Sequence, residues 1–419
     1  MDILYAPMDI PIELCQLILS KANFLTQIRL RCVCRIFYQR LEVNDLYAIG
    51  KYWYLLSALS DEILQAYPFI TRLYAGSNSK ISTLAHMTKL EVLNAFGNCG
   101  ITDASISTLN LRILHAGSNP NITNVNHMPR LKELVATDES GISDDGIQVP
   151  GLEKLYTRCN SKITDVNHLT NLRMLDAEYK SGIGNKGISN LNLRELRASS
   201  NMKITNVNHM TKLQRLSARG KCGIDSHGIE NIHLRCLNAA ANPHIRKINH
   251  VDRLETLYAG GMCGIDDECI SRLNVKFLHV NSNPKITNVN HMTNLQRLFV
   301  TNTCGINDIG IQNLTNLRIL NVQSNTKITD INHLTRLHTL SATGRCGIDN
   351  HSIQNLSLRE LNITRNPNIT NIKHMTRLRK LYASGNDCGL ADDGIAGLRL
   401  RKLYAEGNPK ITRKIEKLI

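Results

Sequence analysis

Long apolar runs and abundant cysteine are both missing from this sequence of 419 residues. No segment approaches the roughly 18 consecutive apolar residues that indicate a membrane-spanning helix. The first residues do not form the basic-then-apolar pattern of a signal peptide, because Asp2, Asp9 and Glu13 interrupt them. The 12 cysteines are too few for a disulfide scaffold and are typical of buried thiols in a reducing compartment. We therefore expect a soluble intracellular protein of the cytoplasm, the nucleus or both.

Motifs for catalysis and metal binding are missing as well. The sequence contains no Walker loop, G-x-S-x-G, H-E-x-x-H or paired-cysteine zinc motif. We therefore predict no enzymatic activity, no catalytic residue, no cofactor and no metal site.

Positive charge is concentrated in one part of the chain. The formal net charge is +15, but residues 1–69 contain six Lys/Arg against seven Asp/Glu, which leaves 44 against 28 for the remaining residues. This excess favours acidic partners, such as acidic or phosphorylated proteins or nucleic acid, although it also keeps a long protein soluble.

The feature that dominates the sequence is a repeat. The pattern L-x-x-L recurs in seventeen coils, spaced alternately 20 and 21 or 22 residues apart. Its second leucines are Leu73, Leu93, Leu114, Leu134, Leu155, Leu175, Leu196, Leu216, Leu237, Leu257, Leu278, Leu298, Leu320, Leu340, Leu361, Leu381 and Leu403. Such periods indicate leucine-rich repeats, each adding one short strand to a stacked α/β solenoid. We predict a curved superhelix with a parallel concave sheet of about 17 strands, and short 3₁₀ or single-turn helices on the return paths.

Two coil types alternate along the repeat. The first type, as in residues 278–295, always contains an asparagine, and eight of its coils contain a histidine: His86, His127, His168, His209, His250, His291, His333 and His374. The second type, as in residues 257–273, contains C-G-I, whose glycine fits a tight turn. Equivalent positions two coils apart are separated by about 10 Å, too far for disulfides or shared metal ions. We interpret these residues as structural ladders, with a pH-sensitive histidine surface as the alternative.

The residues flanking each strand leucine on the outward face vary, so they are candidates for recognition. Tyr258, His279 and Phe299 follow the leucine in three consecutive coils, with Phe277 beside them, and predict a target-binding aromatic patch. Scattered surface aromatics are the alternative interpretation.

A basic residue stands two positions before the leucine in ten coils. These residues are Arg112, Lys132, Arg173, Arg194, Arg235, Lys276, Arg318, Arg359, Arg379 and Arg401. Among them, Arg235, Lys276 and Arg318 flank the aromatic patch and are predicted target contacts. The row predicts binding of an acidic or phosphorylated segment, or else a solvated edge that opposes aggregation.

The N-terminal residues have a different pattern, with apolar residues at helical spacing between Ile10 and Val43. Ile10, Pro11, Glu13, Leu14, Ile18, Leu19 and Ser20 resemble the L-P-x-E-[LI]-x-x-x-I-L-S opening of the F-box. Val33, Cys34, Arg35, Phe37 and Tyr38 resemble its later V-C-R-x-[FW]-[YR] motif. Joined to the repeats, these motifs resemble the F-box/LRR family over nearly the full chain.

The resemblance implies a substrate adaptor of a cullin-RING ubiquitin ligase. It implies a helical F-box domain at residues 1–50, a linker and cap at 51–69, and a solenoid at 70–419. It also implies docking on a Skp1-like adaptor, and through it on cullin, by Ile10, Pro11, Leu14, Ile18, Leu19 and Val33. The alternative for these helices is a plain N-terminal cap of the solenoid. The alternatives for the whole chain are a non-ligase interaction scaffold and, with less support from aromatics, a nucleic-acid-binding solenoid.

Overall fold

The computed structural model describes residues 44–47 and 56–412, and within them eighteen short strands pair in parallel in chain order. The strands are β1 (Asp45–Leu46), β2 (Arg72–Tyr74), β3 (Val92–Asn94), β4 (Ile113–His115), β5 (Glu133–Val135), β6 (Lys154–Tyr156), β7 (Met174–Asp176), β8 (Glu195–Arg197), β9 (Arg215–Ser217), β10 (Cys236–Asn238), β11 (Thr256–Tyr258), β12 (Phe277–His279), β13 (Arg297–Phe299), β14 (Ile319–Asn321), β15 (Thr339–Ser341), β16 (Glu360–Asn362), β17 (Lys380–Tyr382) and β18 (Lys402–Tyr404). Each predicted leucine lies at the centre of one of the strands β2 to β18, so the predicted parallel solenoid is confirmed.

Strand β1 is one more strand than the repeat predicts. Asp45 pairs with Arg72, and Leu46 pairs with Leu73 of β2. This pairing lies inside the segment that was expected to be helical, and two residues are too short to produce a pattern in the sequence. The sheet therefore begins before the first L-x-x-L coil.

Short helices occur on the return paths, as predicted. They are α5 (Asp61–Gln65), α6 (Asp103–Ile106), η2 (Asp144–Gly146), η3 (Asn185–Ile188), η4 (His227–Ile229), α7 (Asp267–Ile270), η5 (Ile309–Ile311), η6 (His351–Ile353) and η7 (Asp393–Ile395). From α6 onward, the described helices belong to second-type coils, whereas first-type coils return through turns.

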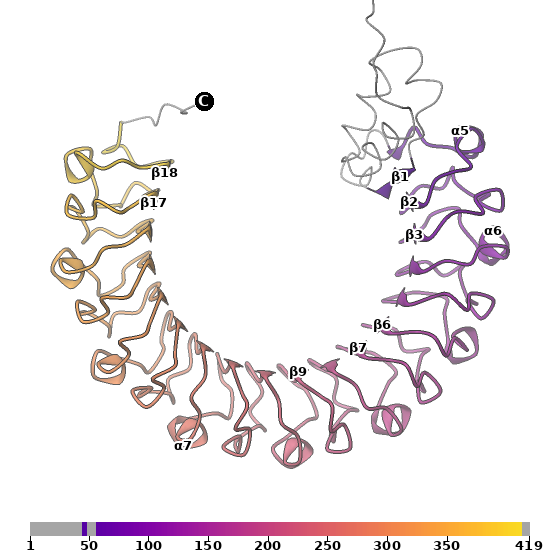
Figure 1. Cartoon of the computed structure of the whole chain (residues 1–419), viewed down its shortest axis with the longest axis horizontal. Helices are drawn as coiled ribbons and strands as arrows, with labels where there is room; N and C mark the ends of the chain where they lie inside the picture. The colour runs from indigo at the N-terminus through magenta and orange to yellow at the C-terminus, as the bar shows by residue number, and fades with distance from the viewer. Residues whose placement is uncertain (1–43, 48–55, 413–419) are drawn as a thin grey trace, which may run out of the picture. The chain divides into compact units, whose positions relative to one another are not determined.

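The chain divides into two compact units, Met1–Leu196 and Arg197–Ile419. Within each unit the strands lie on the inner side of the coils and the short helices on the opposite side (Figure 1). The core lies between them, and strand leucines such as Leu257, Leu278 and Leu298 are fully buried. Each buried leucine contributes about 1.5 to 3 kcal/mol to folding, and the repetition of this contribution is what drives stacking.

Each of the strands β2 to β18 is followed by a residue with left-handed backbone, four positions after the strand leucine. Glycine takes this position in some coils, such as Gly220 and Gly261 with φ of 66° and 69°. In eleven coils a residue with a side chain takes it, including Tyr179, Ala241 and Arg365. A side chain in this conformation costs about 1 to 2 kcal/mol, so the turn geometry is imposed by stacking.

The glycine of the C-G-I motif has a different role from the one predicted. Gly264 is not among the residues of positive φ. Instead, a Cβ atom there would lie 2.5 Å from the carbonyl oxygen of Pro243 and 2.6 Å from that of Ile245. The glycine therefore lets the backbone of one coil approach the coil before it.

The buried asparagine of each first-type coil binds the backbone of the preceding coil. Asn283 Nδ2 donates to the carbonyl oxygens of Ala259 at 2.8 Å and Ile265 at 3.1 Å. Its Oδ1 accepts from the amide of Lys285 at 2.9 Å. The same three bonds recur at Asn119, Asn160, Asn242, Asn325, Asn366 and Asn408. The asparagine thus replaces the backbone partners that are missing where the strand turns away.

The repeated histidines bind the ends of the short helices. His291 Nε2 lies 2.9 Å from the carbonyl oxygen of Ile270, the last residue of α7. Because a carbonyl oxygen only accepts, Nε2 is the donor. It is the second donor to this carbonyl at the helix end, which also accepts from the Leu273 amide at 2.9 Å. Equivalent bonds are formed by His86, His127, His168, His250, His333 and His374. This contact is the structural role that the repetition of the histidine predicts.

Candidate protein-binding surface on the strand face

Four aromatic side chains meet on three neighbouring strands of the second unit. The register places His279 opposite both Tyr258 and Phe299. Ring centroids lie 5.2 Å apart for Tyr258 and Phe277, 5.5 Å for Tyr258 and His279, 5.3 Å for Phe277 and Phe299, and 5.7 Å for His279 and Phe299. All four side chains are half-buried, so the aromatic cluster, defined as these four residues, presents one continuous surface.

His279 contributes the two ring nitrogens of the aromatic cluster. Its Nε2 lies 3.1 Å from Asn281 Nδ2, an amide donor, so Nε2 accepts and the proton of the neutral ring is on Nδ1. Nδ1 is buried and has no hydrogen-bond partner within the described residues. Burial lowers the pKa of His279, and the charge of Arg219 lowers it further. The cluster is therefore uncharged at neutral pH, with one buried N–H that is unsatisfied.

The basic row divides into paired and unpaired members. Glu255, at the same position of the intervening coil, lies 3.8 Å from Arg235 and 3.2 Å from Lys276. Arg318 has no ion pair within the described residues. Of the three predicted basic contacts, Arg235 and Lys276 thus share the single negative charge of Glu255, whereas Arg318 has no carboxylate partner among the described residues.

Paired basic residues also occur in the first unit. Lys132 Nζ lies 3.3 Å from Glu153, and Arg173 lies 3.9 Å from the same carboxylate. Arg112 lies 4.0 Å from Glu91. Glu91, Glu153 and Glu255 stand two residues before a strand leucine, the same position as the basic row. The sequence therefore shows that carboxylates share this position, and the structure shows which basic residues they contact.

A second aromatic contact joins the start of the sheet to the third repeat strand of the first unit. The Tyr47 hydroxyl lies 3.0 Å from His115 Nδ1, and the Tyr47 ring makes an edge contact with Tyr74 at 6.1 Å. Arg72 covers the Tyr47 ring at 5.2 Å from its centroid. Burial lowers the pKa of His115, which favours the neutral ring that accepts from the hydroxyl. Tyr47 lies outside the repeat pattern, so sequence reasoning gave no signal for this contact.

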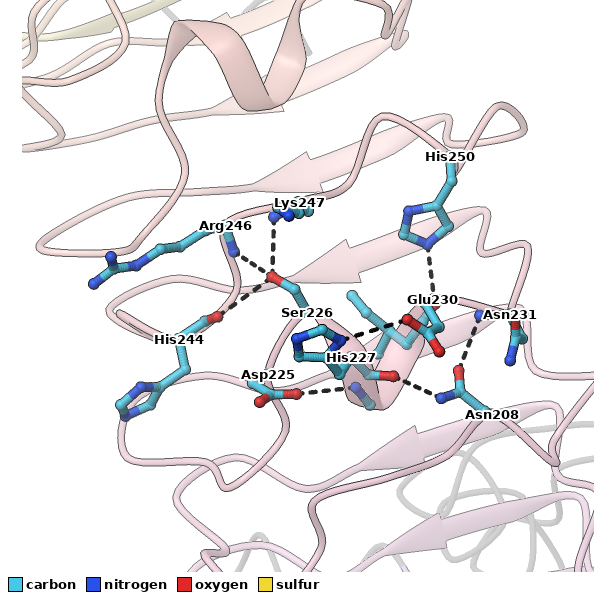
Figure 2. Close-up of polar contacts among 12 residues, drawn as sticks. Asn208, Asp225, Ser226, His227, Glu230, Asn231, His244, Arg246, Lys247 and His250 are labelled. Carbon is cyan, nitrogen blue, oxygen red and sulfur yellow. Dashed lines mark hydrogen bonds and ion pairs between the residues drawn. The ribbon is translucent and has the colours of Figure 1, made fainter.

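An inter-coil contact of aspartate recurs in most second-type coils, and Asn185, Ser226 and Asn350 stand at its position in the other three. In most second-type coils an aspartate accepts from the next coil, as Asp267 does from the amide and hydroxyl of Thr287 at 2.8 and 2.6 Å. Ser226 replaces the aspartate in one coil, and Figure 2 shows its Oγ between the amides of Arg246 and Lys247, at 2.8 and 3.0 Å. The substitution keeps the acceptor and removes its negative charge.

The described part of the chain contains no cluster of metal-ligating side chains. Within it, no three His, Cys, Asp or Glu side chains are arranged to hold a metal ion. The nine cysteines described there are free, and burial raises the pKa of thiols such as Cys263. No helix of residues 56–412 has the length and apolarity to cross a bilayer.

The predicted Skp1 contacts lie outside the described residues. They are Ile10, Pro11, Leu14, Ile18, Leu19 and Val33. Their arrangement therefore stays a prediction from the sequence.

Comparison with known families and structures adds two findings. Residues 8–48 match the model of the F-box domain. The protein of a TLR13-ssRNA13 complex is 20% identical over 84% of this chain and 61% of its own length, with a TM-score of 0.58. An internalin from Listeria monocytogenes is also 20% identical, over 77% of this chain and 88% of its own, with a TM-score of 0.36. No curated protein matches the sequence.

Proposed function

Because an F-box domain precedes a leucine-rich-repeat solenoid, the chain fits the F-box/LRR proteins, and on that premise we propose that it is the substrate-recognition adaptor of an SCF-type (Skp1-cullin-F-box) E3 ubiquitin ligase. The F-box docks on Skp1, and the strand face of the repeats holds the target protein. The ubiquitin transfer itself belongs to other subunits, so this chain contributes binding and positioning and no catalytic residue. This function requires the cytoplasm or the nucleus, and the free cysteines are compatible with either.

The F-box match at residues 8–48 is the observation that carries the ligase assignment. It includes both sequence motifs, with Ile10, Pro11, Leu14, Ile18 and Leu19 in the first and Val33 in the second. These apolar residues supply the Skp1 contact.

The aromatic cluster carries the assignment of the target contact. Hot spots of protein interfaces are enriched in aromatic residues and arginine at well-packed sites. Tyr258, Phe277, His279 and Phe299 meet this description because their rings already pack against each other and need little ordering on binding. Arg318, Lys276 and Arg235 form the polar surround of the cluster, with Arg318 the strongest electrostatic contact.

Capture of purified Skp1 tests the ligase assignment. The double variant Pro11→Ser with Leu14→Ser should lose capture in a pull-down and keep the circular dichroism spectrum and thermal unfolding of the repeats. Met262→Ser is the matched control, because it removes an apolar side chain that is 74% exposed in the second unit. Retained capture by the double variant would refute the F-box assignment, and co-elution of Skp1 and cullin from eukaryotic cells would support it.

Target capture from the same cells tests the aromatic cluster. Tyr258→Ala with Phe299→Ala should reduce the proteins that co-purify with the chain, whereas Skp1 capture is unchanged. Phe96→Ala with Tyr179→Ala is the control, because it removes two exposed aromatic rings from the first unit. Equal loss in both double variants would contradict a specific role of the cluster. Target capture without Skp1 binding would instead identify a non-ligase scaffold.

A further inference from the structure

Five consecutive coils at the C-terminal end of the second unit present basic residues or histidine at one position. Arg318, His338, Arg359, Arg379 and Arg401 each stand two residues before a strand leucine, preceding β14 to β18. We call them the open basic row. Adjacent strands are about 4.8 Å apart, so the row spans about 19 Å.

In earlier coils, glutamates such as Glu91, Glu153 and Glu255 occur at this position, whereas the open basic row contains no carboxylate. Within the described residues, none of its four arginines forms an ion pair. The neighbouring carboxylate of Glu360 is occupied by Lys380 Nζ at 2.9 Å. Arg379 is held in place by bonds from its guanidinium to the carbonyl oxygens of Thr376 and Leu378, at 3.0 and 2.9 Å. Four like charges therefore accumulate without internal compensation.

A polar hollow lies at the first member of the row. Asn294, Gln296, Asn316 and Arg318 line it. Asn316 is already engaged, with Nδ2 donating to Thr293 O at 2.9 Å and Oδ1 accepting from Arg336. The Gln296 amide and the Arg318 guanidinium have no side-chain bond within the described residues, so their donors are available to a ligand. Amide and guanidinium donors together suit an oxyanion.

His338 lies between two of the arginines. Partial burial lowers its pKa, and the charges of Arg359 and Arg318 lower it further. Its Nδ1 lies 3.1 Å from Thr339 Oγ1, and Arg318 and Arg359 are the charged groups that face it from the neighbouring coils. An anion bound across the row would screen that repulsion and raise the pKa of His338. Binding an anion is therefore coupled to uptake of a proton.

We propose that the open basic row is the site at which an extended, phosphorylated or carboxylate-rich peptide segment of the target binds across the ends of the strands. The identification of this segment with the ligase target rests on the proposed function, whereas the binding of such a peptide does not. At about 3.3 Å per residue, about six extended residues cover the row, with alternate side chains facing the arginines.

The geometry favours a peptide over single-stranded nucleic acid. Nucleic-acid grooves combine positive charge with aromatic rings whose faces are free to stack on bases. Here Tyr382 and Tyr404 stack on each other, with centroids 4.7 Å apart and planes at 10°. The rings of the aromatic cluster also contact each other. The faces between these rings are therefore closed to an inserted base.

Fluorescence anisotropy with the full chain tests the proposal without any ligase subunit. The probes are labelled peptides of about ten residues that carry phosphoserine, aspartate or serine at alternate positions, and an oligouridine of similar length. We expect the phosphoserine and aspartate peptides to bind and the serine peptide to fail, with the relative affinity of the first two identifying the anion. Arg318→Ala with Arg359→Ala should weaken binding about tenfold for each arginine, which corresponds to about 1.4 kcal/mol each.

Arg112→Ala with Arg173→Ala is the matched control, because it removes the same charge from the same position where glutamates compensate it. Equal weakening by both pairs would overturn the site and indicate an effect of net charge. Tighter binding of oligouridine than of any peptide would also overturn it. Affinity for the aspartate peptide should rise as the pH falls below 6.5, because the lowered pKa of His338 places its protonation there, and His338→Gln should abolish that rise. Loss of Skp1 capture would leave these binding results unaffected, so the two proposals fail separately.

Discussion

The return path and the strand face of this solenoid differ in how much their residues vary from coil to coil. Five positions after the strand leucine, every first-type coil has asparagine. One position after the same leucine, seventeen coils have eight different residue types, among them tyrosine, asparagine, aspartate and arginine. The repeated residues bind backbone atoms of the neighbouring coil, which are the same in every coil. The variable residues contact side chains that differ from coil to coil, as His279 does between Tyr258 and Phe299. Uniformity therefore marks positions of assembly, and variation marks the positions at which we propose recognition.

The largest effect should come from removing a buried asparagine. Asn283→Ala leaves the Lys285 amide without its partner and the carbonyls of Ala259 and Ile265 with only the weak thiol donor of Cys263. The substitution should lower the free energy of unfolding by about 3 kcal/mol. Urea unfolding measures it. Asn294→Ala, at an exposed position of the same return path, should change stability by less than about 0.5 kcal/mol. Similar losses in both variants would contradict the structural role of the buried asparagine.

A smaller effect is expected from the aspartate contact between coils. Asp267→Ala removes three bonds at the protein surface and should cost about 1 to 2 kcal/mol. The opposite substitution, Ser226→Asp, should stabilise by about 0.5 kcal/mol, because a charged acceptor strengthens the bonds from the amides of Arg246 and Lys247. The shift of thermal midpoint measures both, and destabilisation by Ser226→Asp would show that this coil is held differently.

The histidine contact should have a local effect. His291→Phe removes one of the two donors to Ile270 O, and a loss of about 1 kcal/mol corresponds to an increase of about fivefold in local opening. Hydrogen exchange of the Leu273 amide, which donates to Ile270 O at 2.9 Å, reports it. His227→Phe, at a side chain that is 85% exposed, should leave that exchange unchanged. Equal acceleration by both substitutions would refute the structural role.

The smallest expected effect is a gain in stability. Ala241 has φ of 56°, while the coils on either side have glycine at this position. Ala241→Gly should raise the unfolding free energy by about 0.5 kcal/mol, because relief of left-handed strain exceeds the added entropy of the unfolded chain. Ala239→Gly, two residues earlier in ordinary extended backbone, should instead lower it by about 0.5 to 1 kcal/mol. The urea midpoints of the two variants measure both effects. Equal midpoints would exclude strain at Ala241.

The sequence predicts most of this fold because the second leucine of each L-x-x-L pattern is the central residue of a strand. It also predicts the meeting of Tyr258, His279 and Phe299, since the same position in consecutive coils must be adjacent. Compensation of charge was not predicted, because it depends on which carboxylate faces each basic residue, as Glu255 does for Arg235 and Lys276. The contact of Tyr47 with His115 joins positions 68 residues apart and lies outside the repeat, so periodicity carried no information about it.

The alternation of coil types limits how such a chain can change in length. His291 of a first-type coil needs the helix end of the second-type coil before it, and Asp267 of that coil needs Thr287 of the first-type coil after it. Insertion or deletion of a single coil would place two coils of one kind side by side and leave both connections broken. The module that can be duplicated or lost is therefore the pair, which repeats after 41 residues, as from Leu257 to Leu298.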